Sequence, residues 1–282
     1  MTTSKLSCLP VSYFSKIISG DMSILSWLQE ASDLGFDGAD LSIHFLKKRG
    51  VKRLNEIKEA YETTGLKLAL LNTYPQLLHP DTEVRQREIK QLMEDIQIAG
   101  YLGAENVRLV SGQWFPGVTK EEGIQRTLAG LEAVMETAEQ CNVVLVFENH
   151  SKPAGWTYPD FSFNPEIFLE IYENLKTIGI KILFDTANPI AFGVDPLPLM
   201  KQVIDRVTCI HIADTSEKGK LVPSVIGKGL VPFNELFAYL EEINYSGWLS
   251  IEEASATGQM GVAAAYHYVR GRLNVGKSQF KD

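Results

Sequence analysis

Residues 143–150 read VVLVFENH and residues 181–188 read KILFDTAN, and these two stretches indicate the fold class. Each starts with a short apolar run that ends on an acidic residue, Glu148 or Asp185. Strands buried on both faces of a parallel sheet have this nearly continuous apolar character. Runs of the same kind recur along the chain and predict eight strands: Leu6–Tyr13, Gly38–His44, Lys67–Asn72, Asn106–Ser111, Val143–Glu148, Lys181–Asp185, Val207–His211 and Trp248–Glu252.

Helix-length amphipathic segments separate the predicted strands. Ile89, Leu92, Met93 and Ile96, for example, share one face at the helical period. Eight alternations of strand and helix favour a closed (β/α)8 TIM barrel of the α/β class over an open doubly wound sheet. No glycine fingerprint follows the first predicted strand, which argues against dinucleotide binding. We expect residues 1–282 to form a single TIM-barrel domain.

Cap residues agree with two of the predicted helices. Asp21 precedes the apolar stripe that begins at Ile24, and Gly35 follows it. Asn164 and Pro165 predict the start of the helix after the fifth strand, because a cap residue followed by proline is typical of a helix N-terminus.

Composition limits the compartment and the partners. The formal charge of -8, from 27 basic and 35 acidic residues, argues against a nucleic-acid partner, which needs clustered Lys and Arg. Three widely spaced cysteines predict reduced thiols and a cytoplasmic location. The sequence has no apolar segment of the roughly 20 residues that span a bilayer, so we expect no membrane association.

The last four predicted strands end on residue types that bind metals. Glu148, Asp185, His211 and Glu252 close apolar runs, and the carboxyl ends of barrel strands meet on one face. Such a group without a cation is costly, so we predict one divalent ion there, Mn²⁺, Mg²⁺, Co²⁺ or Zn²⁺. Taken singly, each residue is better explained without a metal: Glu148 and Asp185 as caps of adjacent helices, His211 as a core histidine, and Glu252 as the partner of a lysine. Glu253 is the alternative to Glu252, because neighbouring strand residues point opposite ways.

At these residues the chain resembles the xylose isomerase-like superfamily of sugar isomerases, epimerases and dehydratases, whose members share a TIM barrel. The resemblance covers nearly the whole chain and rests on FENH with Glu148, FDTAN with Asp185, IHIAD with His211 and LSIEEAS with Glu252. The ketose 3-epimerases of this group look closest in mechanism. Their first and last glutamates are both metal ligands and acid/base catalysts, which implies these roles for Glu148 and Glu252.

The chain departs from the ketose 3-epimerases at two positions. Their Asp-Thr-x-His segment reads DTAN here, so Asn188 replaces a substrate-contacting histidine, and Glu217 stands where they carry an arginine. The segment IGKG, with Lys228, matches their Gly-Lys-Gly stretch, although such a lysine is often part of an ordinary turn. The fold also resembles that of endonuclease IV, but the extra histidines of that trinuclear zinc site are missing, which argues against a nuclease.

These features predict a metal-dependent sugar isomerase or epimerase. In this hypothesis a proton moves next to a carbonyl through an enediolate, with Glu148 and Glu252 on opposite faces of the substrate. Two alternatives remain: a polyol dehydratase or lyase that uses the same metal, and a sugar-binding barrel without catalysis.

Five residues are candidates for substrate contacts: Arg108, His150, Trp156, Asn188 and Lys228. A guanidinium buried in the fourth strand needs an acidic partner such as Glu148 or a substrate hydroxyl. His150 follows Glu148 by two residues, so it points the same way if the strand continues; a backbone-bonded loop histidine is the alternative. Asn188 either contacts the substrate or shapes a turn before Pro189.

The chain segments after three strands suggest further contacts. Trp156 belongs to an aromatic loop, residues 151–163, that walls the pocket, stacks on a sugar or contacts a second subunit in a homo-oligomer. Barrels often bind phosphate after the seventh and eighth strands, so a phosphorylated sugar is considered besides a free sugar or polyol. The residues concerned are Lys218, Lys220, Ser255, Thr257 and Gly258.

Overall fold

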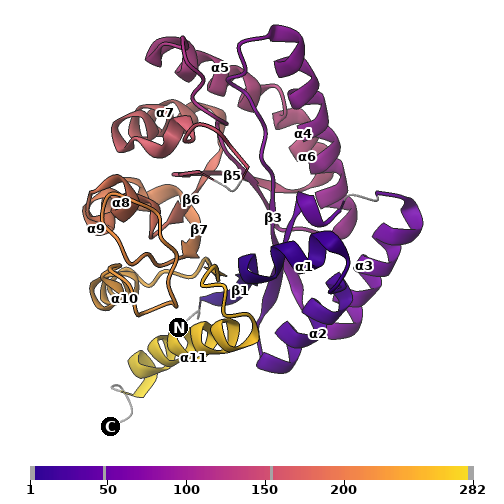
Figure 1. Cartoon of the computed structure of the whole chain (residues 1–282), viewed down its shortest axis with the longest axis vertical. Helices are drawn as coiled ribbons and strands as arrows, with labels where there is room; N and C mark the ends of the chain where they lie inside the picture. The colour runs from indigo at the N-terminus through magenta and orange to yellow at the C-terminus, as the bar shows by residue number, and fades with distance from the viewer. Residues whose placement is uncertain (1–3, 47–48, 153–154, 279–282) are drawn as a thin grey trace.

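The computed structural model describes residues 4–46, 49–152 and 155–278. Within these residues, eight parallel strands form one sheet in the order β1-β8-β7-β6-β5-β4-β3-β2, with helices around it (Figure 1). The TIM barrel predicted from the sequence is therefore confirmed. Its strands are β1 (Lys5–Leu9), β2 (Gly38–Ser42), β3 (Lys67–Asn72), β4 (Asn106–Leu109), β5 (Val144–Glu148), β6 (Lys181–Asp185), β7 (Val207–Ile212) and β8 (Trp248–Glu252).

The barrel is nearly closed, and its seam lies between β1 and β2, the two ends of the hydrogen-bonded order. Asp37 spans this seam: its N–H donates to the Leu6 carbonyl at 2.9 Å, and its Oδ2 accepts from the Leu6 N–H at 2.8 Å. Deeper in the barrel, the Ser7 hydroxyl donates to Oδ2 of Asp40 at 3.0 Å. Side-chain hydrogen bonds thus join the two strands at the seam.

The ends of two strands differ from the prediction. We expected the first strand to reach Tyr13, but it ends at Leu9, because Pro10 has no N–H to continue a ladder, and a 3-10 helix follows at Val11–Tyr13. The second strand ends at Ser42, whose hydroxyl accepts the N–H of His44 at 3.2 Å and starts another 3-10 helix. The remaining predicted bounds are right within two residues.

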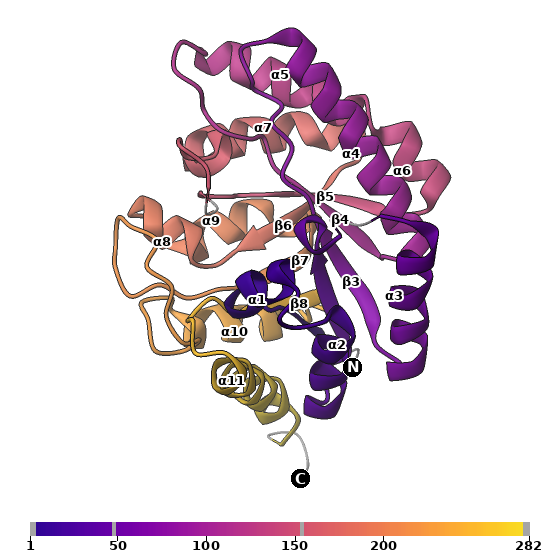
Figure 2. The same cartoon turned by 45° about the vertical axis from the view of Figure 1, so that its right-hand side comes forward.

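The helices surround the strands, as the rotated view in Figure 2 shows. No helix in the described part of the chain is long and apolar enough to cross a bilayer. The helices are α1 (Phe14–Ser19), α2 (Ile24–Leu34), α3 (Val51–Thr64), α4 (Thr82–Leu102), α5 (Lys120–Glu132), α6 (Met135–Cys141), α7 (Pro165–Ile178), α8 (Asn188–Phe192), α9 (Pro196–Val203), α10 (Phe233–Glu242) and α11 (Gln259–Ser278).

Two of the three predicted caps are found in the structure. Helix α7 starts after Asn164, whose side chain accepts the N–H of Glu166 at 2.9 Å, and helix α2 ends before Gly35, which has a φ of 92°. The expected cap at Asp21 was wrong. Ser23 caps α2 instead, because it directly precedes the helix and its hydroxyl accepts the N–H of Ser26 at 3.0 Å.

The side chains of the barrel strands point alternately inward and outward, and this alternation places several polar side chains in one layer. The barrel strands contribute a compact apolar cluster of Ala69, Leu70, Val146, Leu183, Cys209 and Trp248. Side chains of a strand repeat their direction every second residue, so Glu148, Asp185 and His211 point the same way as Val146, Leu183 and Cys209. A polar layer therefore lies above an apolar floor, toward the carboxyl ends of the strands. On the outer side of β5, Phe147 stacks against Phe168 of α7 with ring centroids 6.3 Å apart.

Candidate metal centre

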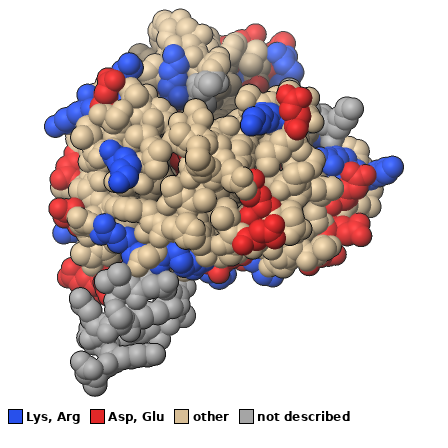
Figure 3. Space-filling model, turned by 60° about the horizontal axis from the view of Figure 1, so that its bottom comes forward, with Lys and Arg blue, Asp and Glu red and all other residues tan. Residues whose placement is uncertain are grey.

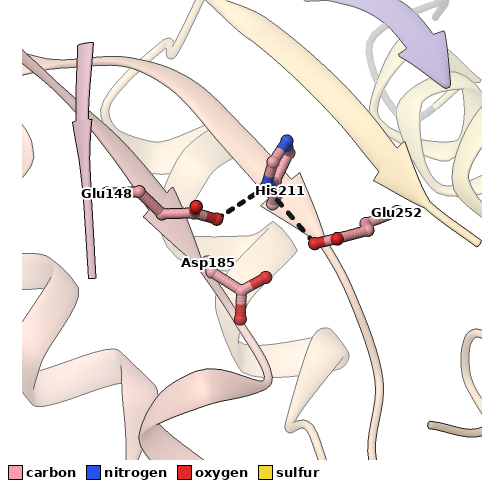
Figure 4. A group of neighbouring side chains, drawn as sticks. All are labelled: Glu148, Asp185, His211 and Glu252. Carbon is pink, nitrogen blue, oxygen red and sulfur yellow. Dashed lines mark hydrogen bonds and ion pairs between the residues drawn. The ribbon is translucent and has the colours of Figure 1, made fainter. Parts of the chain in front are cut away.

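Four side chains from neighbouring strands converge at the carboxyl end of the barrel (Figure 4). Glu148 ends β5, Asp185 ends β6, His211 lies in β7 and Glu252 ends β8. One potential ligand atom from each lies within 4.8 Å of those of the other three. The structure thus brings together all four residues that the sequence predicted as metal ligands.

The His211 imidazole lies between two of the carboxylates. Its Nδ1 is 2.7 Å from Oε1 of Glu148 and 3.4 Å from Oε2 of Glu252, and the other ring nitrogen points away from the group (Figure 4). Glu148, Asp185 and His211 are buried, whereas the Glu252 side chain is 25% exposed. Access from solvent is therefore on the Glu252 side of the group.

Hydrogen bonds to the backbone fix the orientation of Asp185. Its Oδ1 accepts the N–H groups of Ala187 at 2.8 Å and Asn188 at 2.6 Å. The neighbouring Asn149 side chain bonds both the N–H and the carbonyl of Asp185, at 2.7 and 3.0 Å. A carboxylate held this way needs little reordering to bind a cation.

Burial and charge act against each other at these groups. Burial alone would raise the pKa of Glu148, but Arg108 and His211 lower it to about 2. Burial would lower the pKa of His211, but Glu148 and Glu252 raise it to about 9. For Asp185, burial and the charges of Glu252 and Glu148 raise the pKa well above its usual value. The imidazolium and the Arg108 guanidinium therefore leave one of the three carboxylates, Asp185, without a balancing charge.

This donor set fits a divalent cation. It offers one imidazole nitrogen and three carboxylates, with no thiolate, which suits Mn²⁺, Mg²⁺, Co²⁺ or Zn²⁺. A dication bound among the four residues would relieve the repulsion that raises the pKa of Asp185.

Arg108 of β4 supports Glu148 from below. The guanidinium is 1% exposed, and its Nη1 donates to Oε2 of Glu148 at 3.0 Å, as expected for a buried arginine with an acidic partner. Its Nη2 donates to the carbonyl of Thr73 at 2.8 Å, and its central carbon lies 4.3 Å from the ring centroid of Tyr74. The substrate contact predicted for Arg108 stays a prediction.

Comparison with known families identifies the fold family. The family model described as "Xylose isomerase-like TIM barrel" matches residues 28–268. The chain belongs to this family. The resemblance seen in the strand-end motifs is thereby confirmed.

Individual known proteins are similar to this chain along most of their length. L-ribulose-5-phosphate 3-epimerase UlaE of Escherichia coli (strain K12) is 24% identical over 94% of this chain and 95% of its own. The inosose dehydratase of Clostridium tetani (strain Massachusetts / E88) is 22% identical over 80% of each chain. The crystal structure of a D-tagatose 3-epimerase-like protein superposes with a TM-score of 0.78 at 18% identity, covering 98% of this chain and 99% of that one.

In this xylose isomerase-like barrel, two predicted substrate residues lie in the loop after β5. The buried His150 has its Nδ1 3.5 Å from Oδ2 of Asp160, and this ring nitrogen has no hydrogen-bond partner among the described residues. Trp156 packs edge-on against His150, with ring centroids 5.8 Å apart. Asp160 is itself anchored, because it accepts the N–H groups of Gly112 and Ser162 at 3.1 and 2.8 Å.

The other two predicted substrate residues have different surroundings. Asn188 is buried beside Asp185 and opens α8, which combines the turn role with proximity to the metal ligands. Lys228 is exposed, and it takes part in none of the ion pairs found among the described residues. Its loop is nevertheless ordered by Asp214, whose Oδ2 accepts the N–H groups of Gly227 and Gly229 at 2.9 and 2.8 Å.

Glu253, the alternative ligand, points away from the metal centre. It is buried, and its Oε1 accepts the N–H of Ser255 at 2.9 Å at the start of the loop to α11. A carboxylate therefore occupies part of the region in which we considered phosphate binding, and it would repel an anion there.

Two polar residues of this layer were not predicted from the sequence. Asp40 is a fully buried carboxylate in β2, and the same signal that drew attention to Arg108, a charge inside a strand, could have found it. Tyr74 follows β3, and its ring lies between the Arg108 guanidinium and His44, which stacks on it at 4.6 Å. No sequence signal singled out Tyr74, since a single tyrosine after a strand is common.

Proposed function

We propose that this protein is a divalent-metal-dependent sugar isomerase or epimerase. The observation that carries the proposal is the convergence of Glu148, Asp185, His211 and Glu252 within 4.8 Å at the carboxyl end of the barrel. The likeness to a ribulose-phosphate 3-epimerase along 94% of the chain supports the same class of reaction.

In this proposal two of the four residues have a second role besides holding the metal ion. A bound divalent ion would polarise the substrate carbonyl and stabilise negative charge on its oxygen. All four residues would hold the ion, and Glu148 and Glu252 would also exchange the proton on the carbon next to the carbonyl. Because the two glutamates come from β5 and β8 and lie on different sides of His211, one can remove the proton and the other return it on the opposite face. The enediolate thus formed is reprotonated with inversion.

The proposed substrate is a small sugar or polyol. His150, Trp156 and Asn188 lie close to the metal ligands or to one another and are proposed to contact hydroxyls or the apolar face of the sugar. Arg108 contributes mainly through Glu148, and Lys228 contacts the substrate from the ordered loop after β7. A free sugar fits the proposal directly, and a phosphorylated sugar fits it with the phosphate placed away from Glu253.

A dehydratase of the same fold is the second candidate, because the chain is also similar to an inosose dehydratase. The same general base would then remove the proton, and a neighbouring hydroxyl would leave as water instead of a proton returning to the opposite face. A barrel that binds sugars without turnover is the third candidate. One experiment distinguishes it from the isomerase and from the dehydratase.

The experiment combines metal analysis with isotope exchange. The purified protein is supplied with each of the four candidate ions, and then incubated in deuterated water with a panel of ketoses, ketose phosphates and keto-polyols. Deuterium at the carbon next to the carbonyl, together with a new stereoisomer or aldose, supports the proposal. Loss of water from the substrate favours the dehydratase. Ligand-dependent stabilisation without either product favours the binding barrel and contradicts the proposed enzyme.

We further propose a cytoplasmic protein without a nucleic-acid partner. The three cysteines are free, as predicted, and two of them are buried. On the face shown in Figure 3, basic and acidic side chains are interspersed, and they do not form a continuous basic surface of the kind that nucleic acid requires. Homo-oligomer formation through the loop that contains Trp156 is part of the same proposal, and light scattering of the purified protein tests it.

A further inference from the structure

Among the buried polar atoms of the described residues that lack a hydrogen-bond partner, two belong to residues that the strand register brings together. They are Nε2 of His211, the ring nitrogen that points away from the carboxylates, and Oδ1 of Asp40. Both residues are fully buried, with 0% of their surface exposed. A buried polar atom without a partner costs free energy, so such atoms mark places where a proton, water or ligand completes the arrangement.

The strand register places Asp40 and His211 in the same layer. His211 of β7 is paired with Ser250 of β8, and Ser250 is paired with Ser7 of β1. The hydroxyls of Ser7 and Ser250 both donate to Oδ2 of Asp40. Asp40 is thus hydrogen-bonded to Ser250, the residue of β8 that is paired with His211, and its other oxygen, Oδ1, has no partner among the hydrogen bonds of the described residues.

The charge of His211 also affects the pKa of the Asp40 carboxyl. Burial raises the pKa of the Asp40 carboxyl to about 6, while the hydrogen bond from Ser250 and the positive charge of His211 act against this rise. Hydrogen bonds from Ser7 and from the backbone of Leu70 act in the same direction. The imidazole is therefore near enough for its charge to act on the Asp40 carboxyl.

Metal binding at Nδ1 sets a requirement on the other nitrogen. Nδ1 can bind a cation only through its lone pair, so the remaining ring proton must sit on Nε2. Histidine ligands almost always donate that proton to a carboxylate, carbonyl or water, which fixes the tautomer and raises the basicity of the ligand. In this barrel the unpaired Oδ1 of Asp40 is available for that role.

We infer that Asp40 is the positioning residue of the metal ligand His211: when an ion binds at Nδ1, the Nε2–H group donates to Oδ1 of Asp40, directly or through one water. The inference rests on the proposed metal site. It assigns Asp40 a role beyond joining β1 to β2, because the seam needs only Oδ2, which Ser7 already bonds.

Metal affinity of three variants tests this role. Asp40→Leu removes the acceptor, Asp40→Asn keeps a neutral one, and Ser7→Ala removes the seam hydrogen bond but leaves the carboxylate in place. Affinity for Co²⁺ or Zn²⁺ is measured by competition with a chelator. We expect Asp40→Leu to lose about 10- to 100-fold in affinity, Asp40→Asn to lose less, and Ser7→Ala to bind like the wild type.

Two further measurements separate positioning from folding. Circular dichroism and the melting temperature of the metal-free variants show whether each barrel is folded; if Asp40→Leu does not fold, Asp40→Asn decides. In the zinc-loaded wild type, ¹⁵N NMR should show a proton on Nε2 of His211 with slow solvent exchange, and Asp40→Asn should accelerate that exchange.

The outcomes distinguish the two proposals. If folded Asp40→Asn and Asp40→Leu bind the ion as tightly as the wild type, the role of Asp40 is overturned and the metal site stands. An equal loss of affinity in Ser7→Ala would also overturn it, because the seam would then be responsible. If the wild type binds none of the four ions, both the metal site and the role of Asp40 are wrong.

Discussion

Oε1 of Glu148 lies 2.7 Å from Nδ1 of His211, and both side chains are fully buried. Without a metal this pair is held together by the proton on the imidazole. A cation that binds among the same atoms must take the place of that proton. Metal binding and protonation are therefore linked at this site.

The first prediction is that metal binding releases protons. Glu148 and Glu252 raise the pKa of His211 to about 9 against the opposing effect of burial, so the metal-free imidazole is protonated at neutral pH. Binding at Nδ1 expels this proton, and the raised pKa of Asp185 provides a second source. Apparent affinity should rise with pH up to about 9 and fall toward acid pH, with about one to two protons released per ion at neutral pH.

Isothermal titration calorimetry in buffers of different ionisation enthalpy measures this release directly. The apparent binding enthalpy should change in proportion to the ionisation enthalpy of the buffer. Equal enthalpies in all buffers would show that His211 and Asp185 carry no displaceable proton, contrary to the prediction.

The second prediction concerns the partner on the other side of Glu148. Arg108→Met leaves a fully buried carboxylate without its guanidinium, which lies 3.0 Å away. Removing one partner of a buried ion pair costs about 3–5 kcal/mol, so we expect a loss of that size in the free energy of unfolding of the metal-free protein. A saturating divalent ion should restore part of it by supplying positive charge near Glu148.

A surface pair provides the matched control for Arg108. Lys120 lies 2.6 Å from Glu170, and the two side chains are 42% and 48% exposed. Lys120→Met should leave the free energy of unfolding close to the wild-type value, because solvent screens the exposed pair. Urea denaturation of both variants gives the comparison, and similar small losses would mean that Glu148 does not depend on Arg108.

The fold and the four ligand candidates could be predicted because both depend on local patterns in the sequence. Apolar runs mark buried parallel strands, and a polar residue at the end of such a run, as in Asp185 or Glu252, faces the open end of a barrel. Strand ends were less accurate where a single local feature decided them, such as the missing N–H of Pro10. That residues 1–282 form one domain stays a prediction.

Asp40 could not be assigned in the same way, because its partners are distant in the sequence. Ser7 is 33 residues away and Ser250 is 210 residues away, and they meet Asp40 only through the register of β1, β2 and β8. The contact between Tyr74 and Arg108 likewise depends on how β3 and β4 are paired. Contacts set by barrel closure cannot be read from spacing along one chain.

The third prediction tests the two proposed proton-transferring groups. Glu148→Gln and Glu252→Gln keep the shape of the side chain but cannot exchange a proton. We expect each substitution to lower the turnover, and the rate at which the substrate proton exchanges with solvent deuterium, by about 10²- to 10⁴-fold at saturating metal. This is the usual contribution of general acid–base catalysis. Metal affinity, measured in parallel, separates a loss of catalysis from a loss of the ion.

Glu253 gives a control one residue away from Glu252. Its carboxylate bonds Ser255 and faces away from the other ligands, so Glu253→Gln should keep the exchange activity. Wild-type exchange in either Glu148→Gln or Glu252→Gln would remove that residue from the proposed mechanism.

The fourth prediction concerns the packing that holds the loop with Trp156 in place. A Cβ added at Gly123 of α5 would overlap the ring of Phe161, which is fully buried and packs edge-on against Trp114 at 5.2 Å. The Phe161 backbone is also fixed by a 3.0 Å hydrogen bond to the carbonyl of Gly112, so the ring has little room to move. Gly123→Ala should therefore lower the free energy of unfolding by about 1–3 kcal/mol, as overpacking of a core does.

A glycine-to-alanine substitution in open surroundings should instead raise the free energy of unfolding. A Cβ at Gly271 of α11 would meet no atom within 4 Å apart from the adjoining residues and its own helix backbone, so Gly271→Ala should stabilise the protein by about 0.5–1 kcal/mol through helix propensity alone. Urea denaturation of both variants checks the pair. Because Phe161 follows Asp160, the partner of His150, the loss in Gly123→Ala should be accompanied by weaker substrate binding, whereas Gly271→Ala should bind normally. Stabilisation by both alanines would show that Phe161 can move aside, and that the loop is not fixed by this contact.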